Sequence, residues 1–188
     1  MKVSVIDSSS IIEIREIVPR TPPSLRNGVY AALDGLVAAG TLCFPHQVLG
    51  ELHRGASAKS SDPHDPYVWA RKHEAQSKRF GPLYAEAAEV QEQVDNLVDP
   101  DESGPDPADP YVIAYAEKVR AEANDVVVIT DDRKKPPHLT ALSVAAGHFG
   151  FPSVNMRHFL KSQRIWPLVA AAGAAPGIAA TAAGDTAS

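Results

Sequence analysis

The stretch VVVIT at residues 126–130 indicates the fold class of this chain. An apolar run of β-branched residues is typical of a strand covered on both faces, as strands of parallel sheets are. Asp131 and Asp132 follow the stretch directly and predict a polar turn at its end. We therefore expect a buried strand with two acids just beyond its carboxyl end.

A short second strand is expected at the start of the chain. The run KVSVI at residues 2–6 is followed by Asp7 and three serines. Ile11, Ile12 and Ile14 come next at near-helical spacing, so a helix is predicted directly after the acid. The first strand thus also ends at an acid.

Strand and helix patterns alternate along the rest of the chain. Further short strands are predicted at residues 41–44 and 152–155. Helices are predicted near 24–40 with Ser24 as the cap, from Pro45, near 67–79, near 82–97, from Asp109 as N-cap with Pro110 first in the helix, from Pro136 to about His148, and near 156–163. This alternation predicts an α/β protein with a mainly parallel sheet.

Length and composition favour one globular domain followed by a tail. The chain has 188 residues, 44% of them hydrophobic, which is enough to bury a core without disulfides. Residues 1–166 are expected to form the domain. Residues 167–188 contain ten Ala and three Gly with one charge, so they are expected to form a disordered tail.

The net charge, the cysteine count and the lengths of the apolar runs exclude or disfavour several classes of protein. The net charge of −5 argues against a generic DNA-coating protein. The single cysteine, Cys43, excludes an internal disulfide and a Cys-rich zinc site. No apolar run approaches the roughly 20 residues that span a bilayer. Asp7 interrupts any signal-peptide core, so a cytoplasmic protein without membrane contact is expected.

Acidic residues gather at the predicted carboxyl edge of the sheet, where ligands bind in open parallel α/β folds. They are Asp7, Glu51, Asp109, Asp131 and Asp132. Each has an ordinary structural explanation, as a cap, a turn residue or a solvated surface acid. Their joint placement favours a site for a hard divalent cation such as Mg²⁺, which prefers oxygen ligands.

Four segments together resemble a PIN domain. They are VIDSSSIIE at residues 5–13, FPHQVLGEL at 44–52, ADPYVIAYA at 108–116 and VVVITDDR at 126–133. More narrowly, they resemble a PIN-like branch long catalogued only as a domain of unknown function. The resemblance covers roughly residues 3–160 in chain order.

The resemblance implies a three-layer α/β/α sandwich with metal-dependent ribonuclease activity. Many members of that family are toxins of bacterial toxin–antitoxin pairs, including the VapC type. The implied cofactor is one or two Mg²⁺ or Mn²⁺ ions, the substrate is RNA, and the partner is an antitoxin protein. The oligomeric state stays open, with a homodimer as one option.

The resemblance also assigns roles to individual residues. Its first three acids fall on Asp7, Glu51 and Asp109. The fourth follows a T-x-D pattern that selects Asp132 when counted from Thr130, with Asp131 as the adjacent alternative. Ser8 or Ser9 is the small hydroxyl residue expected near a metal-bound water.

Basic residues after the fourth acid are candidates for contacts with RNA phosphates. They are Arg133, Lys134 and Lys135, for which a solvated loop is an equally good interpretation. Arg54 is a weaker candidate.

Other chemistries find little support in the motifs. The chain has no G-x-G-x-x-G, no P-loop and no G-x-S-x-G element. A haloacid-dehalogenase pattern would need a second Asp at position 9, which is Ser9. The remaining alternative is a catalytically silent PIN-like module that acts through a protein partner.

Overall fold

The computed structural model describes residues 1–55, 65–99, 107–132 and 138–166. Its sheet has four parallel strands in the order β2-β1-β3-β4. Their bounds are β1 Lys2–Ile6, β2 Leu42–Cys43, β3 Asp125–Ile129 and β4 Ser153–Val154. The central pair, β1 and β3, is in register from Lys2 opposite Asp125 to Ile6 opposite Ile129. The predicted parallel α/β class is therefore confirmed.

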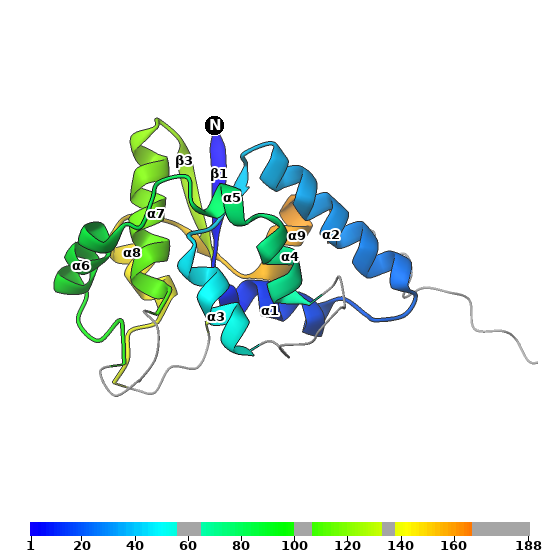
Figure 1. Ribbon diagram of the computed structural model, residues 1–188, viewed down its shortest axis with the longest axis horizontal. Helices are drawn as coiled ribbons and strands as arrows, with labels where there is room; N and C mark the ends of the chain where they lie inside the picture. The colour runs from blue at the N-terminus through cyan, green and yellow to red at the C-terminus, as the bar shows by residue number, and fades with distance from the viewer. Residues whose placement is uncertain (56–64, 100–106, 133–137, 167–188) are drawn as a thin grey trace, which may run out of the picture.

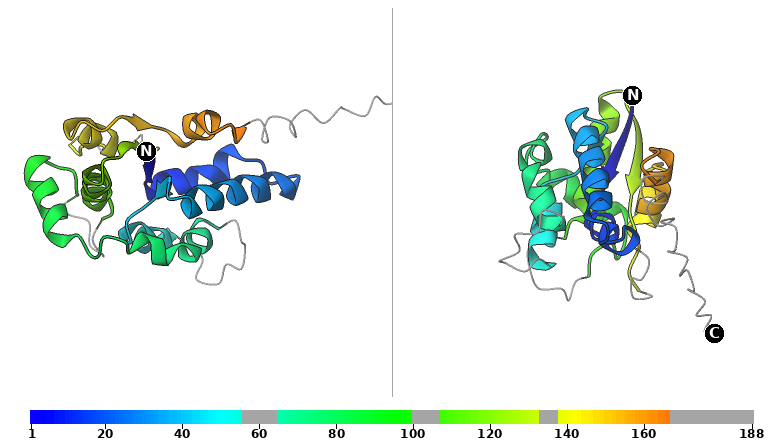
Figure 2. Two further views of the ribbon diagram at one scale, coloured as in Figure 1. Left: turned by 90° about the horizontal axis from the view of Figure 1, so that it is seen from above. Right: turned by 90° about the vertical axis from the view of Figure 1, so that its right-hand side faces the viewer.

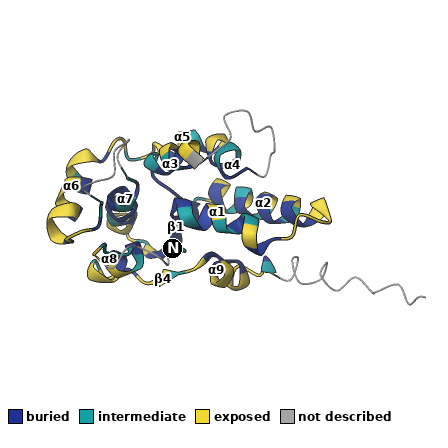
Figure 3. Ribbon diagram, turned by 90° about the horizontal axis from the view of Figure 1, so that it is seen from below, coloured by how far each residue is buried: buried dark blue, intermediate teal, exposed yellow. Residues whose placement is uncertain are grey.

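Helices cover both faces of this sheet (Figures 1 and 2). They are α1 Ser8–Ile17, α2 Pro23–Ala38, α3 Gln47–Gly55, α4 Pro66–Lys72, α5 Glu74–Ser77, α6 Tyr84–Gln93, α7 Asp109–Ala121, α8 Leu142–His148 and α9 Met156–Ser162. Seen along the strands in Figure 3, α6, α7 and α8 lie on one side and α1, α2 and α9 on the other. The fold is the expected three-layer α/β/α sandwich.

The core covers both faces of the central strands, with α7 on one face and α1, α2 and α9 on the other (Figure 3). Val5, Ile6, Val128 and Ile129 are fully buried, as the apolar runs of both strands predict. In α7 every residue from 110 to 116 is buried, because the helix packs between the sheet and α6. A helix that is apolar on all sides belongs in such a position. This packing fixes the position of α7 relative to the sheet.

The predicted starts of α2 and α7 are wrong by one or two residues. Helix α2 begins at Pro23 with Pro22 in the N-cap position and no side-chain cap, so Ser24 lies inside the helix. Proline suits the first helical position because its φ angle is already fixed. Helix α7 has Ala108 as its N-cap, and Asp109 is its first residue rather than its cap.

The helix predicted from Pro136 begins only at Leu142. Residues 136 and 137 lie outside the described part of the chain. Thr140 is held out of the helix because its N–H donates to the carbonyl of Asn96 and its hydroxyl to that of Asp95. The segment before α8 thus binds the loop after α6 instead of extending the helix.

The pattern near residues 67–79 forms two short helices, α4 and α5, that meet at His73. Among the described helices, none combines the length and the apolar character needed to cross a lipid bilayer. The predicted tail at 167–188 lies outside the described residues.

Candidate active site

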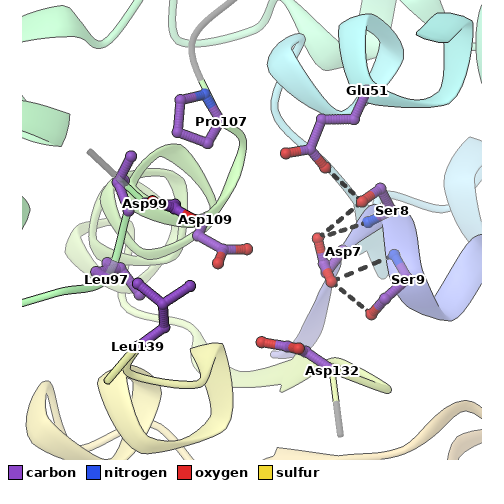
Figure 4. Close-up of a pocket in the computed structure, with 11 residues that line it drawn as sticks. Asp7, Ser8, Ser9, Glu51, Leu97, Asp99, Pro107, Asp109, Asp132 and Leu139 are labelled. Atoms are coloured by element: carbon purple, nitrogen blue, oxygen red, sulfur yellow. Dashed lines mark hydrogen bonds between the residues drawn. The ribbon is translucent and has the colours of Figure 1, made fainter. Parts of the chain in front are cut away.

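A cavity of about 370 Å³ lies beyond the carboxyl ends of β1 and β3 (Figure 4). Its lining residues are Asp7, Ser8, Ser9, Glu51, Leu97, Val98, Asp99, Pro107, Asp109, Asp132 and Leu139. Five of them are acids, and they come from five separate segments of the chain. Four of these five acids are candidates from the sequence, so the structure brings together Asp7, Glu51, Asp109 and Asp132.

Asp7 both caps a helix and lines the cavity. Its carboxylate accepts hydrogen bonds from the backbone N–H groups of Ser8 (2.6 Å) and Ser9 (3.3 Å) at the start of α1. The Ser9 hydroxyl donates to the same carboxylate at 2.6 Å. The residue is only 2% exposed. The cap interpretation of Asp7 is therefore correct, and it is compatible with a place in the pocket.

Burial sets the protonation behaviour of Asp7. Removal from water disfavours the ionised carboxylate and raises the pKa of Asp7 to about 6 from 3.8. The hydrogen bond from the Ser9 side chain opposes this shift in pKa, and the nearby charge of Glu51 adds to it. A divalent cation in the cavity would offset this cost of ionising Asp7.

Glu51 joins three helices at the pocket. Its Oε2 accepts a hydrogen bond from the Ser8 hydroxyl of α1 at 2.5 Å. Its Oε1 accepts one from the backbone N–H of Ala108, the N-cap of α7, at 2.6 Å. Arg54 lies 3.9 Å from the same carboxylate and is not part of the lining. The interpretation of Glu51 as a solvated surface acid is wrong, since its side chain is only 20% exposed.

Asp132 is directed into the cavity by the residue two positions before it. The Thr130 hydroxyl accepts a hydrogen bond from the Asp132 N–H at 3.2 Å, a local turn typical of threonine. Asp132 Oδ2 in turn accepts from the N–H of Leu142 at 3.3 Å. This turn gives a physical reason for the T-x-D spacing.

Asp131 belongs to a different contact. Its Oδ2 accepts hydrogen bonds from the Ser10 hydroxyl of α1 and the N–H of Met156 in α9, both at 2.7 Å. Asp131 does not line the cavity. Its carboxylate links α1 to α9, so of the two adjacent acids the structure places only Asp132 in the pocket.

Asp109 and Asp99 lie side by side in the wall opposite Asp7 (Figure 4). Asp99 is a lining residue that the sequence did not predict, because it opens an acidic, proline-containing loop in which acids are common. One sequence pattern could nevertheless have indicated Asp99. Leu97 and Val98 precede Asp99 as two apolar residues before an acid, the same local pattern as at the end of β1.

The predicted hydroxyl residues support the acids. Ser8 and Ser9 line the cavity. Thr130 does not, but its hydroxyl donates to Asp7 Oδ2 at 3.4 Å and lies 3.5 Å from the Ser9 hydroxyl. Arg133 and Lys134 lie outside the described residues, as does Lys135.

Residues 5–166 match the family described as a domain of unknown function, DUF4411. The chain belongs to the DUF4411 family. No curated protein and no solved structure matches it. All five pocket acids of this DUF4411 domain fall inside the matched range.

The donor set of the pocket suits a hydrated hard cation. In the part of the chain that the structure describes, no three His, Cys, Asp or Glu side chains are placed to hold a metal ion directly. Mg²⁺, however, is usually held by one or two carboxylates and keeps several waters. The described lining offers carboxylates and hydroxyls, with no Lys or Arg among them. These residues therefore fit a cation bound partly through water.

Proposed function

We propose that this DUF4411 domain is a metal-dependent ribonuclease that resembles PIN domains and acts as the toxin of a bacterial toxin–antitoxin pair. The observation that carries the proposal is the convergence of Asp7, Glu51, Asp109 and Asp132 on one cavity. The resemblance to PIN domains selects these same four acids. In sequence they are up to 125 residues apart, and their meeting is a property of the fold.

The four acids are the proposed ligands of a hydrated Mg²⁺ or Mn²⁺, one or two of them directly and the others through bound water. When bound, such a cation lowers the pKa of a coordinated water and neutralises charge on the scissile phosphate. Ser8 and Ser9 hold the carboxylates of Glu51 and Asp7 in place through their hydroxyls. The apolar side chains of Leu97 and Leu139 line the same cavity.

The proposed substrate is single-stranded RNA, cleaved to leave a 5′-phosphate and a 3′-hydroxyl. A cavity of about 370 Å³ is in the range that holds a small ligand, and a phosphodiester with its ribose is such a ligand. The proposed protein partner is an antitoxin that blocks this pocket in the cytoplasm.

A catalytically silent binding module is the second candidate. It is favoured by the structural hydrogen bonds of Asp7 and Glu51, which cap α1 and hold the start of α7. In that case the acids serve the fold, and a protein partner carries the function. Metal-dependent cleavage of RNA separates the two candidates.

The experiment is controlled expression in bacteria of the wild-type chain and the Asp7→Asn variant. Asparagine caps helices about as well as aspartate, so the variant keeps the start of α1. We expect wild-type expression to arrest growth and fragment RNA, and Asp7→Asn to do neither at equal protein level. Arrest by both proteins without RNA fragmentation would favour the binding module.

A further inference from the structure

A second cavity, of about 520 Å³, lies at the turn between α1 and α2. Three arginines, Arg15, Arg20 and Arg26, line it together with Glu16 and the turn residues 17–19. The cavity lined by Asp7, Glu51, Asp109 and Asp132 is called the carboxylate pocket. Helix α1 has ten residues: its first, Ser8, lines the carboxylate pocket, and its last, Ile17, leads into the turn before α2 (Figure 1). The two cavities are therefore separated by about 15 Å of helix.

Arg26 is a buried cation whose recorded contacts among the described residues are with backbone carbonyls. The residue is only 6% exposed. Its Nε donates to the carbonyl of Val18 at 3.0 Å and its Nη2 to that of Arg15 at 2.7 Å. Within the described ranges no Asp or Glu forms an ion pair with it.

The two carbonyls offset only part of the charge of Arg26. They belong to the last turn of α1 and the residue after it, where the helix dipole is negative and attracts a cation. A guanidinium carries five N–H donors, and the two carbonyls use two of them. Burying a charge is unfavourable unless it is paired, so donor capacity and positive charge remain available at the cavity.

The other two arginines add to the positive charge. Arg15 reaches Asp65 at 3.4 Å, and its side chain is about one third exposed. Arg20 is exposed and has no ion pair among the described residues. Glu16, also exposed, is the one acid in the lining. The lining thus holds three guanidinium groups and one carboxylate, and of the three arginines Arg15 alone is seen to reach Asp65.

We infer that this cavity binds a phosphate group through Arg15, Arg20 and Arg26. A guanidinium presents a planar pair of N–H donors that matches two phosphate oxygens, which an ammonium does not. The volume exceeds that of a phosphate alone and admits an attached nucleoside. The ligand is either a phosphate of an RNA strand, a few nucleotides from the bond in the carboxylate pocket, or a free small phosphate. The RNA form rests on the proposed function, whereas the chemistry of the cavity does not.

Binding in the presence of a chelator tests the inference without cleavage. The probes are inorganic phosphate, followed by NMR or calorimetry, and a short single-stranded RNA, followed by fluorescence anisotropy at several salt concentrations. Arg20→Gln is the main variant because Arg20 is exposed and its loss should leave the fold intact. Arg71→Gln, an equal charge change on the exposed end of α4, is the matched control.

We expect Arg20→Gln to weaken binding about fivefold, while Arg71→Gln changes it less than about twofold. For RNA, loss of one phosphate contact should also reduce the salt slope by about 0.7. Weaker binding of RNA identifies an RNA phosphate as the ligand. Weaker binding of inorganic phosphate alone identifies a free small phosphate.

Equal affinities of Arg20→Gln and Arg71→Gln for both probes would overturn the inference. Arg15→Gln provides an independent check, and it should weaken the same probe as Arg20→Gln. Because the measurement needs no metal and no cleavage, its failure leaves the ribonuclease proposal intact. An inactive carboxylate pocket would likewise leave this binding unchanged.

Discussion

Asp131 and Asp132 are neighbours in sequence with different surroundings. Asp132 lines the carboxylate pocket, and Asp131 accepts hydrogen bonds from Ser10 and Met156. We expect Asp132→Asn to reduce RNA cleavage on the order of 100-fold, as lost support of a metal site does. Asp131→Asn should keep the cleavage rate within a few fold of wild type. It should lower the free energy of unfolding by about 1 kcal/mol, because the acceptor of its hydrogen bonds is then a neutral amide in place of a carboxylate. Cleavage rates and urea unfolding of the two variants measure both effects. A larger activity loss in Asp131→Asn would reverse the assignment.

Asp7 makes the stability of the metal-free protein depend on pH. Its raised pKa, about 6 in the folded state against 3.8, means that the folded state binds more protons than the unfolded state between these values. Stability is therefore highest below pH 3.8 as far as Asp7 is concerned, and it falls as pH rises to about 6. The loss amounts to about 3 kcal/mol at 1.36 kcal/mol per pKa unit.

The Asp7→Asn variant removes this dependence. It should be more stable than wild type in chelator at pH 7, and it should gain less from Mg²⁺ or Mn²⁺. Unfolding curves in urea at pH 4.5 and pH 7, with chelator and with metal, provide the measurement. A variant that unfolds more easily at pH 7 in chelator would mean that capping outweighs burial at this residue.

At the residue scale the sequence allowed most of the carboxylate pocket to be predicted. Asp7, Glu51, Asp109 and Asp132 could be selected because each stands next to a strand end or in a motif of the resembled family. Asp99 could not, because its position depends on how the loop after α6 returns to α7. The hydrogen bonds that link Glu51 to Ser8 and to Ala108 could not be predicted either, because these partners lie 43 and 57 positions away from it in the sequence.

At the scale of elements, Glu51 connects α1, α3 and α7. The N–H of Ala108 is buried, and Glu51 Oε1 accepts its hydrogen bond. Glu51→Ala should leave this donor unpaired and lower the free energy of unfolding by about 1–3 kcal/mol. Glu51→Gln keeps an acceptor of the same shape, so it should lose much less stability while still losing RNA cleavage. Thermal unfolding and cleavage assays of both variants provide the comparison. Equal stability losses would show that the charge, rather than the hydrogen bond, holds α7.

Strands were easier to predict than helix ends. The strands at 2–6 and 125–129 are rich in β-branched apolar residues, and four of the five residues in each strand are buried. The start of α8 depended on contacts between Thr140 and the loop at 95–96, which are distant in sequence. Local signals such as Pro136 or Ser24 mark where a helix can begin, and tertiary contacts select where it does begin.

At the scale of the whole molecule, the match to the DUF4411 family ends at Trp166. The segment beyond it contains few bulky residues that could add to a core. Ending the chain after Trp166 should therefore change the melting temperature by less than about 2 °C and leave RNA cleavage unaltered. Scanning calorimetry of the full and shortened chains tests this. A clear loss of stability or solubility would show that the segment docks or mediates assembly.

The central claim is that the acids of the carboxylate pocket cleave RNA with the help of a divalent cation. The most direct measurement is cleavage of a single-stranded RNA by purified protein in Mn²⁺, Mg²⁺ and chelator, with Asp109→Asn as the variant and Asp131→Asn as the matched control. The account predicts cleavage by wild type and Asp131→Asn in metal, none in chelator, and loss on the order of 100-fold in Asp109→Asn. Cleavage by Asp109→Asn at the wild-type rate, or by wild type in chelator, would contradict it.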